Sequence, residues 1–240
     1  SFRAAFGLAG EVLATGISDT NTILGNQGRL FQLSPIGVSG GTWVTLRAGA
    51  VFEARDVPAY ARKGVVEEIW WEESLGGLTD IRESRRLTIS HKHYLPILPH
   101  LVWAQRLVFD WLSGNWPFFL AERTGGEKEL TAFGGGESLR GIVPFRFQGP
   151  VKLLSSTELR WHLWFLNMHF LKSDWQWELD AFADLGRVLN AGETFFGDAW
   201  HLGYGGGVRL LWGRDFVISL DFAVYRETFG GVYFGVAQAF

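Results

Sequence analysis

The sequence predicts an all-β protein, an antiparallel transmembrane β-barrel with about ten strands in this chain, and no more than twelve. The first observation is that apolar and polar residues alternate over segments of about ten residues, the length that crosses a bilayer at a tilt. The second is the high aromatic content, because Trp and Tyr gather near the segment ends as they do in interfacial girdles. Alternation alone also fits a soluble sandwich, so segment length and aromatic placement favour the membrane.

The first five expected strands lie near residues 2–17, 43–56, 63–74, 84–95 and 99–112. In the second strand, apolar residues such as Leu46 alternate with polar ones such as Arg47, which gives one oily and one polar face. The most apolar window, 94–109, is interrupted by Pro96 and Pro99, which separate the fourth strand from the fifth. This window is also too short and too polar for a transmembrane helix.

The last five expected strands lie near residues 151–168, 173–188, 199–213, 215–227 and 231–240. The same alternation appears in 157–166, 174–188 and 214–225: Leu159 follows Glu158, and Leu179 precedes Asp180. The final strand is apolar on one face and ends at the aromatic Phe240, which is unusual for a soluble protein. The strands therefore continue to the end of the sequence.

The expected links between the strands differ in length. Short links fall near residues 57–62, 96–98, 169–172 and 228–230. The other links are mostly long and fall near 18–42, 75–83, 113–150 and 189–198. Apart from the short link at 213–214, long and short links alternate as outer loops and periplasmic turns do in an outer-membrane barrel. An even strand count then places both ends of the chain on the periplasmic side.

The composition limits the classes of function. At 240 residues, the chain fits one domain, residues 1–240, without an internal repeat or linker. A net charge of −3 gives no electrostatic reason to bind nucleic acid, and the absence of Cys excludes disulfide and thiolate chemistry. No signal peptide is visible at the start of the sequence. We expect no cofactor and no metal ion.

A series of short motifs runs through the chain: EARDVPAYARKG (53–64), HYLPI (93–97), LVWAQRL (101–107), NWPFF (115–119), GGGESLRG (134–141), TELR (157–160), FADLG (182–186), HLGYGGGVRL (201–210) and a final aromatic residue. In this order they resemble the barrel of the BamA/TamA superfamily, the bacterial surface-antigen barrels that insert proteins into outer membranes or export them. The resemblance implies barrels of sixteen strands, of which these motifs match the C-terminal ten. Either this chain is a truncated or reduced relative that closes on fewer strands, or partner chains supply the missing strands. It also implies periplasmic POTRA modules, and we expect none within these residues.

The resemblance further implies that the link at 113–150 folds back into the barrel lumen. Arg140, followed by Gly141, would then dock on two acids, Glu158 and Asp184. The alternation agrees, because both acids lie on the face opposite the oily one. A planar guanidinium can bridge two carboxylates, and glycines allow the loop to turn sharply. The alternative is that Arg140 is a solvated loop residue and the glycines only form turns.

Two further sites follow from the resemblance. Arg55, Asp56 and Gly64 match the family's turn motif, although Ala54 stands where the family has Thr. Phe240 would end the closing strand, and a weak seam would join residues 2–10 to 231–240.

Enzymatic readings of the sequence are weaker. His91 and His93 share a strand face but have no third ligand at a suitable spacing, so they are better interpreted as interfacial polar residues. Ser155, Ser156 and His162 lack the surroundings of a nucleophile motif, which leaves a membrane phospholipase as a weak alternative. The run Tyr204–Gly207 resembles a phosphate loop only superficially, since no helix follows it. We therefore expect a protein that is not an enzyme.

The expected function is the insertion, assembly or translocation of outer-membrane proteins in the bacterial outer membrane. Its partners would be outer-membrane lipids, unfolded outer-membrane protein clients and other subunits in the periplasm or the membrane, but no nucleic acid. Two alternatives remain open: a structural or anchoring barrel within a larger complex, and a small-solute pore. A barrel of ten strands is mostly filled by its own side chains, which makes an open conduit the weaker alternative.

Overall fold

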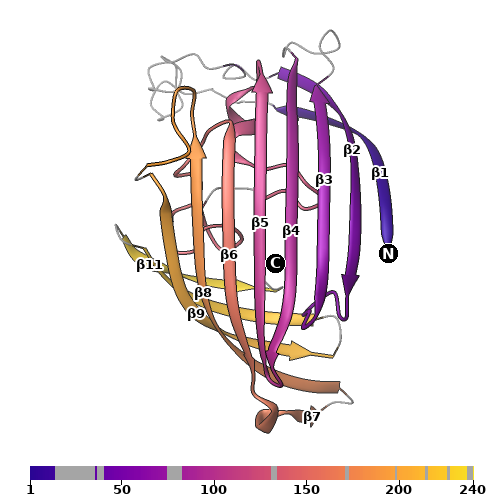
Figure 1. Ribbon diagram of the computed structural model, residues 1–240, viewed down its shortest axis with the longest axis vertical. Helices are drawn as coiled ribbons and strands as arrows, with labels where there is room; N and C mark the ends of the chain where they lie inside the picture. Colours follow the sequence, from indigo (N-terminus) through magenta and orange to yellow (C-terminus); the bar gives the residue numbers. More distant parts are fainter. Residues whose placement is uncertain are drawn as a thin grey trace.

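One antiparallel sheet makes up the architecture, and the loop that follows β5 lies against its inner face (Figure 1). The structure is a computed structural model that describes residues 1–13, 36, 41–74, 83–130, 134–170, 173–197, 199–213, 216–225, 228–236 and 240. The strands are β1 (Phe2–Leu13), β2 (Gly41–Arg55), β3 (Gly64–Ser74), β4 (Ser84–Leu98), β5 (Leu101–Gly114), β6 (Val151–His162), β7 (Met168–Phe170), β8 (Ser173–Leu189), β9 (His201–Trp212), β10 (Phe216–Tyr225) and β11 (Thr228–Gly235). Two stretches of 3₁₀ helix are described in the links: η1 (Phe118–Glu122) and η2 (Trp164–Leu166).

The strands follow one another in the sheet as they do in the sequence. The order is β1-β2-β3-β4-β5-β6-β8-β9-β10-β11, and β7 lies off this path, paired with β8. Every pairing among the described strands is antiparallel. This up-and-down order confirms the predicted all-β, antiparallel class, and each of the ten expected strands has a counterpart.

Three predicted strands differ from the observed ones. The fourth, expected at 84–95, continues to Leu98, so the link expected at 96–98 belongs to β4. The segment expected as one strand at 151–168 divides into β6, η2 and β7, because Leu163 leaves the extended conformation at ψ 75° and the chain turns there. The last expected strand, 231–240, begins earlier and ends at Gly235. In addition, residues 14–17 of the first expected strand lie outside the described residues.

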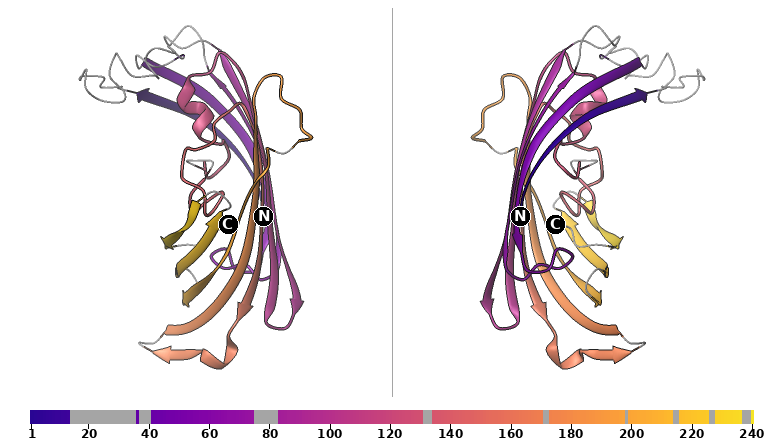
Figure 2. Two further views of the ribbon diagram at one scale, coloured as in Figure 1. Left: turned by 90° about the vertical axis from the view of Figure 1, so that its left-hand side faces the viewer. Right: turned by 90° about the vertical axis from the view of Figure 1, so that its right-hand side faces the viewer.

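The sheet bends into an incomplete cylinder, with β1 and β11 at its two edges (Figure 2). Among the described residues, these two strands do not pair, so the expected seam between residues 2–10 and 231–240 is not formed within the part of the chain that the structure describes. The diameter of a barrel grows with its strand number. The ten strands along this path make up only part of the circumference of a cylinder (Figure 2).

The two faces of the sheet differ as the alternation predicts. On the outer, convex face, Leu159 and Trp161 are 43% and 45% exposed. On the inner, concave face, Glu158 and Arg160 are 0% and 1% exposed. A wall that is apolar outside and charged inside suits a lipid-facing barrel with a polar lumen.

The inner face is covered by the link between β5 and β6, which includes η1 and the 134–142 segment (Figure 2). Leu139 and Ile142 of this link are fully buried and pack with Val108 and Leu154 of the sheet. None of the described helices has the length and apolar character needed to cross a membrane. The link therefore forms an inner layer on the concave side of the sheet.

Candidate functional site

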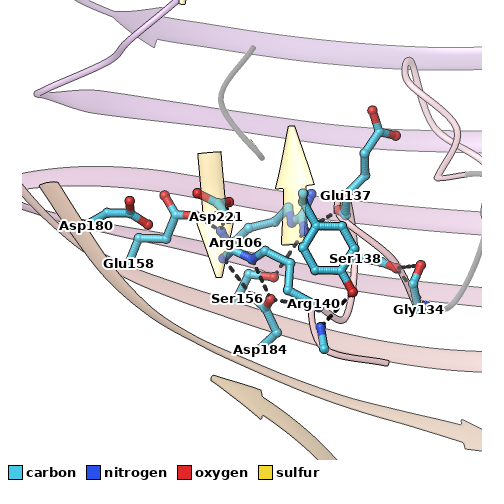
Figure 3. A network of polar contacts seen from close by, with 12 residues as sticks. Arg106, Gly134, Glu137, Ser138, Arg140, Ser156, Glu158, Asp180, Asp184 and Asp221 are labelled. Atoms are coloured by element: carbon cyan, nitrogen blue, oxygen red, sulfur yellow. Dashed lines mark hydrogen bonds and ion pairs between the residues drawn. The ribbon is translucent and has the colours of Figure 1, made fainter. Parts of the chain in front are cut away.

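Three strands, β6, β8 and β10, bring acidic side chains to one place on the inner face. Asp184 of β8 lies opposite Ser156 of β6. Glu158 is two residues further along β6 than Ser156. On β10, Asp221 lies opposite Gly207 of β9. These residues are far apart in sequence, and the antiparallel register places their carboxylates around a common centre (Figure 3).

Arg140 from the loop fills this centre. Its Nε and Nη2 atoms donate to the two carboxylate oxygens of Asp184 at 2.8 and 3.1 Å, a bidentate pair. Its Nη1 atom lies 2.7 Å from Glu158 Oε1 and donates to Asp221 Oδ2 at 3.0 Å. The guanidinium carbon lies 3.5 Å from the centre of the Phe182 ring. We call Arg140, Glu158, Asp184 and Asp221 the arginine cage.

Further charges surround the cage. Glu158 also contacts Arg160 at 2.7 Å and Arg209 at 3.4 Å, while Arg209 reaches Asp180 and Asp221. Opposite charges thus alternate through the network, which offsets the cost of moving each ion out of water. Such a network braces the inner wall and holds the loop.

The electrostatic state of Arg140 follows from these neighbours. The side chain is 1% exposed, and burial alone would lower the pKa of its guanidinium. The carboxylates of Glu158 and Asp184 outweigh burial and raise that pKa well above its ordinary value. Arg140 is therefore a permanent cation and does not transfer protons.

The backbone of the loop tip, like the Arg140 side chain, contacts the sheet closely. Gly141 has a φ of +90°, and its N–H donates to the hydroxyl of Tyr233 on β11 at 2.9 Å. Facing the tip, Gly203 of β9 has no side chain, and an added Cβ would overlap the carbonyl oxygen of Arg140. The glycines of loop and sheet let the two backbones approach each other.

The predicted turn motif closes the hairpin between β2 and β3. The carboxylate of Asp56 accepts hydrogen bonds from the N–H groups of Val57, Arg62 and Lys63 at 2.9, 3.0 and 3.2 Å. The Arg55 side chain donates to the carboxylate of Glu53 at 2.9 Å. Gly64 pairs with Arg55 across the hairpin and has a φ of +127°. The motif thus has a local structural role, away from the cage.

Phe240 lies in a different place from the one predicted. It is not on β11 but on the inner face of the sheet, packed against Tyr94, Val102 and Ala104. Its main-chain oxygen accepts a hydrogen bond from Arg160 at 3.1 Å. Apolar packing and this hydrogen bond place the ring inside the curved sheet.

The residues of the enzymatic alternatives do not form a site. His91 lies on the outer face, 2.7 Å from Glu67. Ser155 accepts a hydrogen bond from Gln105 and Ser156 accepts one from Arg106; among the described residues neither serine is hydrogen-bonded to His162. In the part of the chain that is described, no group of three or more metal-binding side chains occurs.

Sequence reasoning missed part of the cage. Asp221 and Tyr233 contact the loop tip, but no sequence motif links either residue to Arg140. The alternation on β10 is the only signal for Asp221, and no motif marks it. The pairing of β10 with β9 and β11 decides that both residues reach the loop.

Comparisons with known proteins agree with this geometry. A family model described as the Omp85 superfamily domain matches residues 37–240. The crystal structure of BamA from Haemophilus ducreyi lacking POTRA domains 1–3 is similar in fold, with a TM-score of 0.59 at 15% identity. The similarity covers 82% of this chain and 41% of that one, so this chain spans less than half of the matched structure. No curated protein matches by sequence. The chain belongs to the Omp85 superfamily, and its sheet has the fold of the BamA barrel wall.

Proposed function

We propose that this chain forms part of a barrel in the bacterial outer membrane that assists the insertion, assembly or translocation of other outer-membrane proteins. The observation that carries the proposal is the edge strand β11, which pairs only with β10 among the described strands. An unpaired edge offers N–H and C=O groups to which an incoming strand can add. The loop lies against the concave face of the sheet (Figure 2), which favours action at the edge over conduction through the centre.

The arginine cage has a positioning role in this proposal. It fixes the loop against β6, β8 and β10, so the wall beside the edge stays ordered while the edge accepts a strand. The apolar outer face contacts membrane lipids, and the partners at the edge are unfolded outer-membrane proteins and other subunits. The chain acts as a single domain, residues 1–240, without chemical catalysis.

The test places a charge on the proposed edge. Val232 of β11 and Val224 of β10 are both exposed on the outer face, at 64% and 48%. Lysine on an edge strand opposes strand addition. The Val232→Lys variant should therefore slow the folding of a urea-unfolded outer-membrane barrel into vesicles that contain the protein. The Val224→Lys variant places the same charge one strand from the edge and serves as the control.

Three outcomes separate the candidate functions. Faster client folding with wild type and Val224→Lys, but not with Val232→Lys, supports the edge mechanism. No acceleration by wild type, together with unchanged levels of other barrels after depletion in cells, would show an anchoring subunit. Steady conductance of the protein in planar bilayers would instead show a small-solute pore.

A further inference from the structure

The outer face of the sheet carries a row of polar side chains across β3, β4, β5 and β6, four strands that lie side by side (Figure 1). Glu67 of β3 lies opposite His91 of β4. Two residues further along β4, His93 lies opposite Gln105 of β5, which in turn lies opposite Thr157 of β6. With the neighbouring Ser155, we call this row the polar stripe: Glu67, His91, His93, Gln105, Ser155 and Thr157.

The polar stripe lies within the apolar band of the outer face and not at its margin. On β4, the two histidines are flanked on the same face by Ile89 and Leu95, which are 41% and 46% exposed. On β6, Leu159 follows Thr157 on the same face and is 43% exposed. By contrast, the outward-facing residues of β9 and β10 are all aliphatic, aromatic or glycine. Polar groups that face lipid tails are costly, so the stripe calls for a hydrogen-bonding partner.

The two ends of the stripe have complementary chemistry. At the β3 end, Glu67 Oε1 lies 2.7 Å from His91 Nδ1, and the two side chains remain 48% and 35% exposed. At the β6 end, Thr157 donates to Gln105 Oε1 at 2.6 Å, and Gln105 Nε2 donates to Ser155 at 3.0 Å. The Ser155 hydroxyl accepts that bond and can still donate its own proton. One end therefore presents a carboxylate acceptor and the other a hydroxyl donor.

We propose that a second copy of this chain packs on the polar stripe and forms a twofold dimer within the membrane. Two copies inserted in the same direction are related by a twofold axis along the membrane normal. An axis between β4 and β5 places β3 of one copy against β6 of the other. Glu67 then faces Ser155 of the second copy, and the β4 histidines face its Gln105. The acceptor end of each stripe thus meets the donor end of the other.

This inference does not rest on the proposed assembly function. The edge strand β11 lies beyond β8, β9 and β10 from this surface, so it stays free in the dimer. Lipid tails offer no hydrogen bonds to the stripe, whereas a second copy satisfies both of its ends at once.

The first test measures association by sedimentation equilibrium in neutrally buoyant detergent micelles. Wild type should form a dimer whose population rises with protein concentration. The His93→Leu/Gln105→Leu variant gains residues that suit lipid, so it should fold, and its dimer dissociation constant should rise at least tenfold. Ala181→Leu/Ala183→Leu adds the same side chains to the exposed outer face of β8, outside the stripe, and should leave the constant unchanged. A monomeric wild type, or equal constants in all three proteins, would overturn the proposal.

The second test uses disulfide cross-linking in vesicles of phosphatidylethanolamine and phosphatidylglycerol to find which strands meet. The chain has no Cys, so each introduced Cys reports alone. A mixture of the Glu67→Cys and Ser155→Cys proteins should cross-link at least tenfold more than either protein by itself, because the axis pairs unlike positions. Phe222→Cys, at a 52% exposed position on β10, should not cross-link with either. Equal cross-linking of Glu67→Cys with itself and with Ser155→Cys would overturn the arrangement.

Discussion

The two halves of the inner loop are held on the sheet by opposite means. In the first half, residues 118–130, the sheet supplies the cations, and the loop supplies main-chain oxygens and the carboxylate of Glu129, which lies 3.2 Å from Arg47. Arg86 donates to the carbonyl oxygen of Arg123 at 3.2 Å, and Arg47 donates to that of Gly126 at 2.6 Å. Every loop residue has a carbonyl oxygen, so these contacts require little of the loop sequence.

In the second half, residues 134–142, the loop supplies the cation and the sheet supplies the carboxylates. Arg140 is bound by Asp184 and Asp221 as well as by Glu158. The ion pairs between this half and the sheet depend on one side chain, and its loss leaves three buried acids without their shared partner. The difference teaches that the attachment of the second half is the more visible one in the loop sequence, because it depends on a cation that the loop itself supplies.

Arg140→Ala should have the largest effect on this comparison. Removing one partner of a buried ion pair typically costs about 3–5 kcal/mol, because the remaining charges stay buried. We expect a loss of that size in the free energy of unfolding, measured by urea titration of the detergent-folded protein and seen as altered heat-modifiability on gels. Arg146→Ala removes an exposed arginine from the same loop and should change little. Equal losses in the two variants would show that the cage contributes nothing specific.

Arg86→Met should release the first half of the loop and spare the second. Arg86 is 3% exposed in its side chain and lies 3.6 Å from both Glu72 and Asp110, besides its bonds to loop carbonyls. Hydrogen bonds from a charged group contribute about 1.5–3 kcal/mol, so we expect a loss of about 3 kcal/mol. Limited proteolysis with mass spectrometry should place new cleavages within residues 118–130. Cleavage within 134–142 instead would show that the two halves are not independent.

Gly203→Ala should disturb the second half without removing a charge. The new methyl group would overlap the carbonyl oxygen of Arg140, so the loop tip must shift. Overpacking of this kind costs about 1–3 kcal/mol, and we expect about 2 kcal/mol by urea titration. Leu202→Ala, which alters the adjacent exposed position on the outer face, is the comparison variant. A Gly203→Ala protein as stable as wild type would mean that the tip does not rest on β9.

Tyr233→Phe should have the smallest effect. It removes the hydroxyl that accepts the N–H of Gly141 and leaves the ring in place. One hydrogen bond contributes about 1 kcal/mol, and the free energy of unfolding should fall by that amount. Tyr204→Phe, at a 52% exposed position on β9, should have no effect. Hydrogen exchange of the Gly141 amide should rise in Tyr233→Phe alone, and unchanged exchange would refute the contact.

Much of the fold was predictable because strands with two unlike faces leave a period of two in the sequence. The alternation placed each strand to within a few residues and assigned Glu158 and Asp184 to the inner face. The alternation did not predict where β6 ends. The residues after His162 continue the alternation, but the chain turns there. Periodicity describes the faces of a strand and does not mark every turn.

The site was predictable only in part for a similar reason. Arg140 lies in a motif, and Glu158 and Asp184 lie in two others, so motif order linked the three. Asp221 joins them because β10 pairs with β9, and Phe240 enters the inner face because Tyr94 and Arg160 are there to receive it. Pairings between distant strands and contacts with main-chain oxygens leave no local pattern.

The sequence by itself determined the strands, their two faces and the charge carried by the loop, because these depend on neighbouring residues. The tertiary structure decided that the sheet stays open between β1 and β11, which acids surround Arg140 and where the Phe240 ring lies. These outcomes depend on the curvature of the whole sheet around its inner loop. Curvature is a sum over many strand pairings, and no single segment specifies it.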